Sequence, residues 1–367
     1  MPNAIDSKLP YGETLKSLLL QRQLSDSYLH KTLQKKGIFI GSNSKNKTVP
    51  ILCSCLLTPS EFSEIREHRT EKEDSTKQRS EKLTLKTEKR IEEILPEFNI
   101  TDLCASEFNE FTFIGIPTFS RVNNNPDHCK IEYEIRCNNH IDSWTEQGKK
   151  HKGSIEIKRK GDSIETIAIS NHTATATDKI NRNLLSFVKR KMKENGDIED
   201  IDARILFNSF ENKDRIDFLW KMTGNSESEK LRFDKITDVD LKADRSKNPP
   251  KSLNIEWMIQ EISRIHLSGD SLQNTLFLSN SDYYPFLLIW RMQATFRYEI
   301  KNTEGNCRIN FEFSNYPKRD NAEFEISIES IVPDKPYKHV PTTSIRSNIL
   351  EELNERKLMI IDNYIRK

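Results

Sequence analysis

A short sequence that occurs twice constrains the fold of this chain more than any other feature. Tyr133-Glu134-Ile135 and Tyr298-Glu299-Ile300 are identical triplets. Forty-five residues after the last residue of each triplet comes another isoleucine, Ile180 or Ile345, which opens a similar predicted helix. Because the spacing is equal in both copies, we predict that one structural unit has been duplicated.

Each copy contains three stretches in which apolar and charged residues alternate. In the second copy, Phe324, Ile326 and Ile328 alternate with Glu323 and Glu325. Such alternation is typical of a strand with one buried face and one wet face. We expect strands over 129–137, 154–158 and 163–170 in the first copy, and over 295–301, 307–313 and 322–331 in the second. Three antiparallel strands closed by a helix, occurring twice, make an α+β protein with a βββα repeat.

The length and composition fit a folded protein of two or three domains. Of the 367 residues, 35% are hydrophobic and 31% are charged. No apolar run approaches the ~20 residues that span a bilayer, and the first residues lack a signal-peptide pattern. Six irregularly spaced cysteines fit reduced thiols rather than a disulfide framework. We therefore expect a cytoplasmic protein without membrane contact, and no cofactor.

The N-terminal part of the chain contains a basic window. No Asp or Glu occurs from Ser27 to Ser60, although 56 residues of the chain are acidic. The same window holds five lysines, Lys31, Lys35, Lys36, Lys45 and Lys47. Because the net charge of the whole chain is only +1, this local concentration of charge indicates a surface for a polyanion. Nucleic acid is the commonest such partner, and we favour DNA.

The same window predicts two helices joined by an extended stretch. Gly37 suits the left-handed conformation that follows a helix end, and Ile38 begins the extended part. A polar loop is expected over 41–47. We expect Thr48 to cap the second helix, with Pro50 in its first turn.

This arrangement resembles the SAP module and its helix–extended-loop–helix relatives, which are small DNA-binding folds. The resemblance covers residues 26–57 and depends on a short set of positions: Leu33, Gly37, Ile38, Gly41, a loop lysine at position 45 or 47, Leu52 and Leu56. It implies that the loop and the start of the second helix approach a phosphate backbone. The alternative is a helical docking module with solvated lysines.

A charged stretch separates this module from the duplicated body. Arg66 to Lys82 includes no hydrophobic side chain, so we expect an exposed linker or a solvated helix. The predicted domains are a basic module over 1–60, a linker over 61–95, and two α+β units over 96–225 and 226–367.

The first unit carries two further candidate sites. Lys149, Lys150 and Lys152 lie near a predicted hairpin and could extend a nucleic-acid surface. Asp142, Glu156 and Lys158 have the pattern of a metal-dependent nuclease, in which two carboxylates hold a divalent cation and the lysine stabilises phosphate charge.

The paired cysteines of the first unit do not indicate a zinc site. Cys129 and Cys137 fall on the apolar face of one strand, whereas His128 points the other way, so we expect no bound metal.

Three functions follow from these patterns. The favoured one is a non-enzymatic nucleic-acid-binding adaptor whose duplicated body docks a partner protein. The alternatives are a metal-dependent nuclease, and a protein-binding subunit of a microbial defence or repair complex without nucleic-acid contact.

Overall fold

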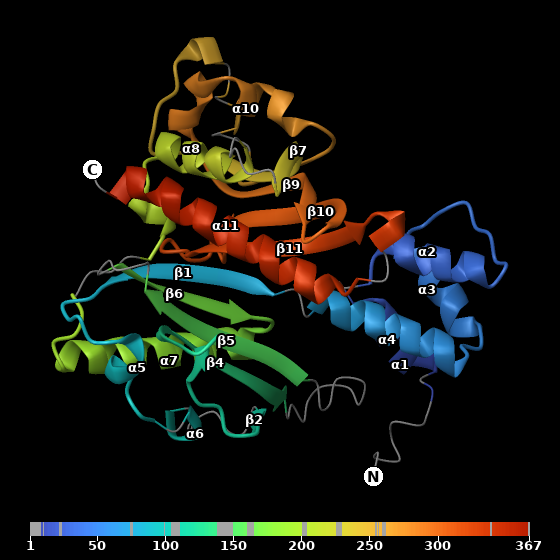
Figure 1. Ribbon diagram of the computed structural model, residues 1–367. Coiled ribbons are helices and arrows are strands. Elements are labelled where there is room, and N and C mark those ends of the chain that lie inside the picture. Colours follow the sequence, from blue (N-terminus) through green and yellow to red (C-terminus); the bar gives the residue numbers. More distant parts are fainter. Residues whose placement is uncertain are drawn as a thin grey trace.

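The computed structural model (Figure 1) describes most of the chain. The described residues are 9, 11–21, 24–73, 76–98, 100–103, 111–137, 150–159, 165–199, 204–224, 230–253, 255, 257–258, 262–337 and 340–365. No helix among them is both long and apolar enough to cross a membrane.

Four helices form a compact N-terminal module, which we call the four-helix module. They are α1 (Gly12–Leu19), α2 (Asp26–Lys35), α3 (Lys45–Ser54) and α4 (Pro59–Glu73). Leucines spaced three and four residues apart, such as Leu29 and Leu33 of α2, give each of the first two helices one apolar face. These faces meet in a core that also buries Leu52 and Ile65.

The rest of the described chain is organised around one antiparallel sheet. Its eleven strands, counted over the described residues, follow the order β2-β4-β5-β6-β1-β11-β10-β9-β7-β8, and β3 also pairs with β4. The strands are β1 (Lys77–Thr84), β2 (Phe111–Ile114), β3 (Ser120–Val122), β4 (Asn125–Cys137), β5 (Lys150–Arg159), β6 (Glu165–His172), β7 (Leu231–Ala243), β8 (Ile265–Ser268), β9 (Leu287–Ile300), β10 (Thr303–Phe313) and β11 (Phe324–Pro333).

The predicted α+β class and the duplicated βββα unit are confirmed. In the first copy, β4, β5 and β6 pair in sequence order and lead into α7 (Thr175–Glu194). In the second copy, β9, β10 and β11 do the same and lead into α11 (Thr342–Ile365). The helices that cover the sheet or connect its strands are α5 (Ile91–Ile94), α6 (Ile100–Leu103), α8 (Asn212–Thr223) and α10 (Leu276–Ser279).

The two copies meet on either side of β1, and their helices cover opposite faces of the sheet. Ala168 of β6 pairs with Glu81 of β1, on the face that α7 covers. Ile326 of β11 pairs with Gln78 of β1, on the face that α11 covers. Gln78 and Glu81 are three residues apart on β1, so their side chains point to opposite faces of the sheet. The two copies are therefore related by a rotation about an axis that runs along the strands. In Figure 1, α11 crosses one side of the sheet while α7 lies on the other.

The prediction of an exposed linker over 66–82 is wrong for its last third. Residues 77–84 form β1, which pairs with β6 along its length and with β11 at Lys77 and Gln78. The four residues from Gln78 to Glu81 are each at most 7% exposed. These polar side chains are buried because charged groups from other elements compensate them, as described below.

Candidate functional site

Three of the five lysines in the basic window are engaged within the four-helix module. The ammonium of Lys35 donates to Glu64 at 2.7 Å, and that of Lys36 donates to Glu61 at 2.8 Å. Both carboxylates belong to α4, which follows the acid-free window in sequence but packs beside it. Lys45 donates to the backbone oxygen of Gln21 at 2.8 Å.

The pKa values reflect this pairing. The hydrogen bond to Glu64 raises the pKa of Lys35, and the bond from Lys36 lowers the pKa of Glu61. The window contains no acidic residue in its sequence, but Glu61 and Glu64 of α4 lie beside its lysines on the folded surface.

Lys31 and Lys47 differ from the other three. Both are exposed, and neither forms an ion pair with any residue that the structure describes. They are the members of the window that remain available to a polyanion.

The local structure corrects several details of the predicted window. Gly37 does follow the helix end, with a φ of 76°. The second helix begins at Lys45, so Lys45 and Lys47 lie in its first turn rather than in a loop, and Pro50 lies in its interior. Leu56 is 94% exposed beyond the helix end instead of on its buried face. The helix thus starts in the polar residues 45–48, where the Thr48 hydroxyl donates to the Ser44 carbonyl at 3.2 Å.

The extended stretch after α2 presents an aromatic ring to solvent. Ile38 donates its backbone N–H to the Leu33 carbonyl at 3.0 Å, and the Ile40 carbonyl lies 3.1 Å from His30 Nε2. Ile38 and Ile40 both pack against the module core, whereas Phe39 between them is 78% exposed. The backbone thus fixes Phe39 as an outward-facing ring.

The candidates on β5 lie on the sheet face opposite α7. Lys150 pairs with Glu134 at 3.0 Å, and Lys152 and Lys158 are exposed. Glu156 Oε1 lies 2.5 Å from His128 Nε2 on the neighbouring strand. Lys149 and Asp142 lie outside the described residues, so the nuclease pattern stays a prediction.

This face of the first unit forms one wall of a long groove whose other wall is α11. We call it the α11 groove; its volume is about 1060 Å³. The lining includes five cations and five carboxylates: Lys130, Lys152, Lys158, Arg159 and Arg346 against Glu132, Glu134, Glu156, Glu351 and Glu355. The charges of the described lining residues therefore balance.

A network of buried charges joins the two copies beside β1. Arg79 is 5% exposed and donates to Glu325 of β11 at 2.8 Å and to Asp178 of α7. Lys77 and His172 also contact Glu325, at 2.8 and 3.4 Å. Burial alone would raise the pKa of Glu325, but the bond to His172 and the charges of Lys77 and Arg79 lower it below its usual range. These ion pairs compensate the buried charges of β1, so the strand can lie in the middle of the sheet.

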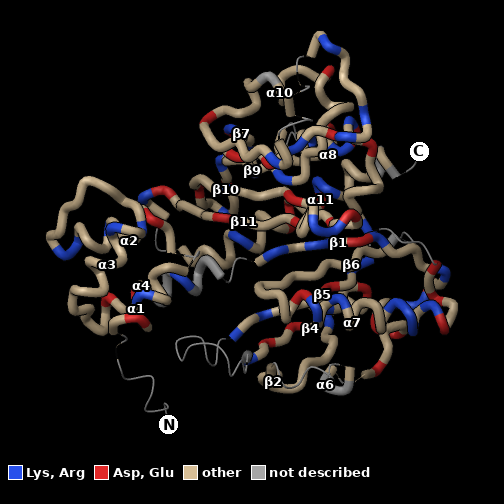
Figure 2. The backbone as a smooth tube through the Cα atoms, turned by 180° about the vertical axis from the view of Figure 1, so that it is seen from behind, with Lys and Arg blue, Asp and Glu red and all other residues tan. Residues whose placement is uncertain are grey.

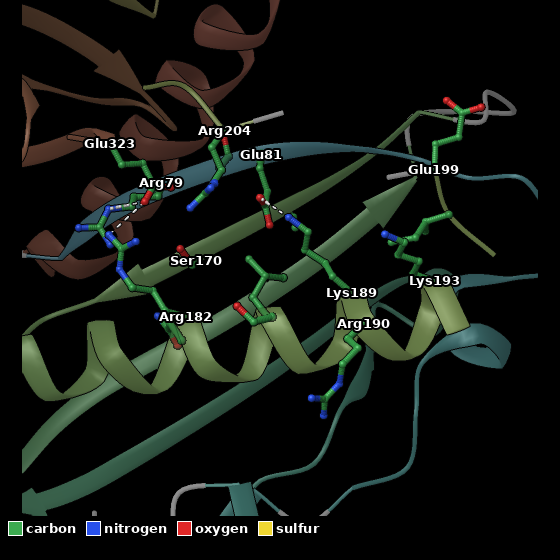
Figure 3. A pocket seen from close by; sticks show the side chains of 16 residues that line it. Arg79, Glu81, Ser170, Arg182, Lys189, Arg190, Lys193, Glu199, Arg204 and Glu323 are labelled. Atoms are coloured by element: carbon green, nitrogen blue, oxygen red, sulfur yellow. Dashed lines mark hydrogen bonds and ion pairs between the residues drawn. The ribbon is translucent and has the colours of Figure 1, made fainter. Parts of the chain in front are cut away.

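A second groove lies on the sheet face that α7 covers, between α7, β1 and the start of the second copy (Figure 3). We call it the α7 groove; its volume is about 510 Å³. Its lining includes six cations and three carboxylates: Arg79, Arg182, Lys189, Arg190, Lys193 and Arg204 against Glu81, Glu199 and Glu323. The rotation that relates the two copies maps the α7 groove onto the α11 groove. Among the described residues that line the two grooves, cations outnumber carboxylates in the α7 groove alone.

Glu81 lies at the centre of the α7 groove. Its Oε2 accepts a bond from Lys189 at 2.9 Å, and Arg204, which Figure 3 shows near Glu81, also acts on the carboxylate through its charge. Its other oxygen, Oε1, is buried and accepts no hydrogen bond from the described residues. Burial raises the pKa of the Glu81 carboxyl.

A run of cations near the end of α7 is the sequence feature that corresponds to this groove, and its role depends on the fold. Lys189, Arg190, Lys191 and Lys193 lie near the C-terminal end of α7, where cations favour the helix dipole. Lys191 bonds Glu194 on the same helix at 2.7 Å. Lys189 and Lys193 instead face β1, and Figure 2 shows the concentration of Lys and Arg along α7.

Comparison with known proteins gives one family match. Residues 13–75 match the model of the GAPS4b protein N-terminal domain, a defence-associated domain. The match spans nearly all of α1–α4 and does not reach the sheet.

Comparison with whole proteins adds no further relationship. No curated protein matches the chain. A solved structure titled as that of DynU16, from the dynemicin biosynthetic locus, is 11% identical and covers 78% of this chain and 95% of its own. Its TM-score of 0.19 supports no shared fold. The chain is therefore similar to the GAPS4b N-terminal domain over its four-helix module alone.

Proposed function

We propose that this chain is a non-enzymatic, nucleic-acid-binding component of a defence system, and that its four-helix module contacts the phosphate backbone. The observation that carries the proposal is the exposure of Lys31, Lys47 and Phe39 on the four-helix module. Two cations without an ion partner among the described residues can contact phosphates, and an exposed aromatic ring can stack on a base. The defence role rests on the match over residues 13–75.

The structure reduces the number of phosphate contacts that we expect. Lys35 and Lys36 would have to leave Glu64 and Glu61 to bind DNA, so Lys31 and Lys47 carry the interaction. Two contacts on duplex DNA predict an affinity that falls roughly ten-fold between 50 and 200 mM salt.

A pair of matched double variants of the full-length chain tests this proposal. Fluorescence anisotropy with a labelled DNA of mixed sequence, single-stranded and duplex, measures affinity against salt. Lys31→Gln with Lys47→Gln should weaken binding on all sequences and flatten the salt dependence. Lys35→Gln with Lys36→Gln removes the same charge from engaged lysines and should change binding little. Equal losses in both double variants, or no salt-dependent binding by the unaltered chain, would exclude this interface.

We further propose that the duplicated body docks a protein partner through the α11 groove. The groove has balanced charge, and Met359 at its rim is 68% exposed beside the buried Leu358. An exposed methionine next to apolar neighbours suits an adaptable protein contact. With a purified protein partner of the chain, Met359→Lys should weaken partner binding while DNA affinity stays unchanged.

A further inference from the structure

We infer that a partner protein docked in the α11 groove inserts a basic side chain between α11 and the groove floor, an inference that rests on the docking proposed above and names the chemistry of the docked group. Three features of the groove support it. They are a polar row across the floor, two buried oxygen atoms without a donor, and unpaired carboxylates on α11.

A row of polar side chains crosses the floor of the groove. Gln78 of β1 pairs with Asn171 of β6, and Asn171 pairs with Ser154 of β5. The Gln78 Nε2 atom donates to Asn171 Oδ1 at 3.2 Å, and Asn171 Nδ2 donates to Ser154 Oγ at 3.2 Å. Because both amide nitrogens donate along the row in the same direction, the amide oxygen of Gln78 remains at its β1 end without a donor.

Asn354 adds a second oxygen of this kind from α11. Gln78 and Asn354 both line the groove, and they are 5% and 4% exposed. Gln78 Oε1 and Asn354 Oδ1 are buried and accept no hydrogen bond from the part of the chain that the structure describes. A buried acceptor without a donor is costly, and the terminal torsions of Asn and Gln are broad enough to turn the oxygen toward an incoming N–H. Ammonium and guanidinium groups, which carry several donors and no acceptor, fit this requirement.

Apolar side chains surround Asn354 and suit the stem of a lysine or an arginine. Leu350 and Leu358 lie four residues before and after Asn354, so the three share one face of α11. Ile167 and Ile169 of β6 line the groove on the floor. Long basic side chains bury their methylene groups on such surfaces and keep the charged head at a polar site.

The charge on α11 beside Asn354 is negative. Glu351 and Glu355 line the groove, are exposed, and form no ion pair with a described residue. Among the described lining residues, α11 contributes one cation, Arg346, which donates to the Ile328 carbonyl at 3.0 Å. The other cations of the lining belong to the strands of the opposite wall: Lys130, Lys152, Lys158 and Arg159. The α11 wall therefore complements a cation.

The size of the groove favours a side chain carried by a protein segment over a free small cation. Its volume of about 1060 Å³ slightly exceeds the usual range for small-molecule sites. A small amine would leave most of this space and the exposed Met359 at the rim without a contact.

Fluorescence anisotropy of the full-length chain with short labelled peptides tests the inference. The peptides consist of Gly, Ala and Ser and differ only at the central position, which is arginine, lysine, norleucine or glutamate. We expect the arginine and lysine peptides to bind about ten-fold more tightly than the norleucine peptide, because only they supply N–H donors to the two amides. The glutamate peptide should bind most weakly.

Variants then locate the site. Asn354→Leu should remove the preference for arginine over norleucine while the norleucine peptide still binds, a result that a misfolded variant would not give. Glu351→Gln with Glu355→Gln should weaken binding of the arginine peptide about ten-fold. Lys152→Gln with Lys158→Gln, the matched control, removes two charges from the opposite wall and should not weaken it.

Three outcomes would overturn the inference. They are no binding of either basic peptide at millimolar concentration, equal binding of the basic and norleucine peptides, and tightest binding of the glutamate peptide. A purified protein partner separates this test from the proposed docking. If Met359→Lys weakens partner binding but Asn354→Leu and the Glu351 and Glu355 variant do not, the docking site stands and the basic side chain is wrong. If none of these variants weakens partner binding, the proposed docking is itself wrong.

Discussion

Tyr133 and Gly153 face each other across β4 and β5, and the tyrosine ring occupies the space where a side chain on Gly153 would lie. A Cβ at Gly153 would be 2.3 Å from the phenol oxygen of Tyr133. That oxygen donates to the Thr177 carbonyl at 2.9 Å, and Asn181 Oδ1 lies 2.7 Å from it. The second copy repeats the pair: Tyr298 faces Gly305, where a Cβ would be 2.6 Å from the phenol oxygen.

We predict that Gly153→Ala destabilises the protein by about 1–3 kcal/mol, because the ring cannot move without breaking its bonds to α7. Urea denaturation measures the loss. Gly41→Ala is the matched control, since a Cβ there meets no atom within 4 Å. If both variants lose the same free energy of unfolding, the close packing of Tyr133 on Gly153 does not contribute to stability.

Lys357 of α11 provides a prediction about pH. Its side chain is fully buried, its Nζ has no hydrogen-bond partner among the described residues, and burial lowers its pKa to about 7. Between pH 7 and the ordinary lysine pKa near 10.4, the unfolded chain binds more protons than the folded chain. Stability should therefore rise with pH from 7 to 9, by at most about 1.4 kcal/mol per unit from this group.

Lys357→Met tests this dependence with a residue that the fold already uses. Met192 lies twelve residues after Ile180, as Lys357 does after Ile345, and Met192 is fully buried. The variant should be more stable than the natural chain at pH 7, with a smaller difference at pH 9. Parallel stability curves from pH 7 to 9 would mean that Lys357 keeps its proton in the folded protein.

The network around Arg79 predicts a large effect from one substitution. Arg79→Met leaves Glu325 buried with less compensation, and we expect a loss of about 3–5 kcal/mol in the free energy of unfolding. Adding Glu325→Leu should recover part of it. A double variant no more stable than Arg79→Met would show that the two side chains act independently.

The same network predicts acid sensitivity. The pKa of Glu325 is lower in the folded protein than the ordinary value near 4.3. The stability that its ionised form contributes is therefore complete above about pH 4.3 and is lost as pH falls below it. Glu325→Gln should be less stable than the natural chain at pH 6, by a margin that narrows toward pH 3.

Hydrogen exchange tests the position of β1. If Lys77 to Thr84 forms the sheet centre, its paired backbone amides should exchange as slowly as those of β10. Fast exchange there, together with slow exchange in β10, would return this stretch to the exposed linker that its composition suggests.

Strands that alternate apolar and charged residues were predictable, and strands that do not were missed. The sequence located all three strands of both copies, because residues such as Ile326 and Ile328 keep a period of two. It missed β7, where shifts in register near Phe233, Ile236 and Asp240 break that period. It also missed β1, whose buried residues include the charged Arg79 and Glu81 and whose partners lie far along the chain.

The candidate sites show the same limit. The five lysines of the acid-free window indicated one basic surface. In the fold, α4 packs beside this window and places Glu61 and Glu64 next to two of the lysines. Conversely, the cations at the end of α7 became a candidate site because the fold places Glu81 and Arg204 opposite them. Neither relationship is visible in local sequence, since each depends on packing between distant elements.

The position of β1 has a consequence for synthesis on the ribosome. β1 emerges early, β6 about ninety residues later, and β11 about 250 residues after β1. If β1 pairs with β6 first, the edge of β1 that later pairs with β11 stays unpaired. It remains so until the C-terminal part of the chain has been synthesised. Lys77 and Arg79 belong to this strand, and charged residues on an open edge strand discourage association with other chains. The charges that later join the two copies would thus first protect the unfinished nascent protein.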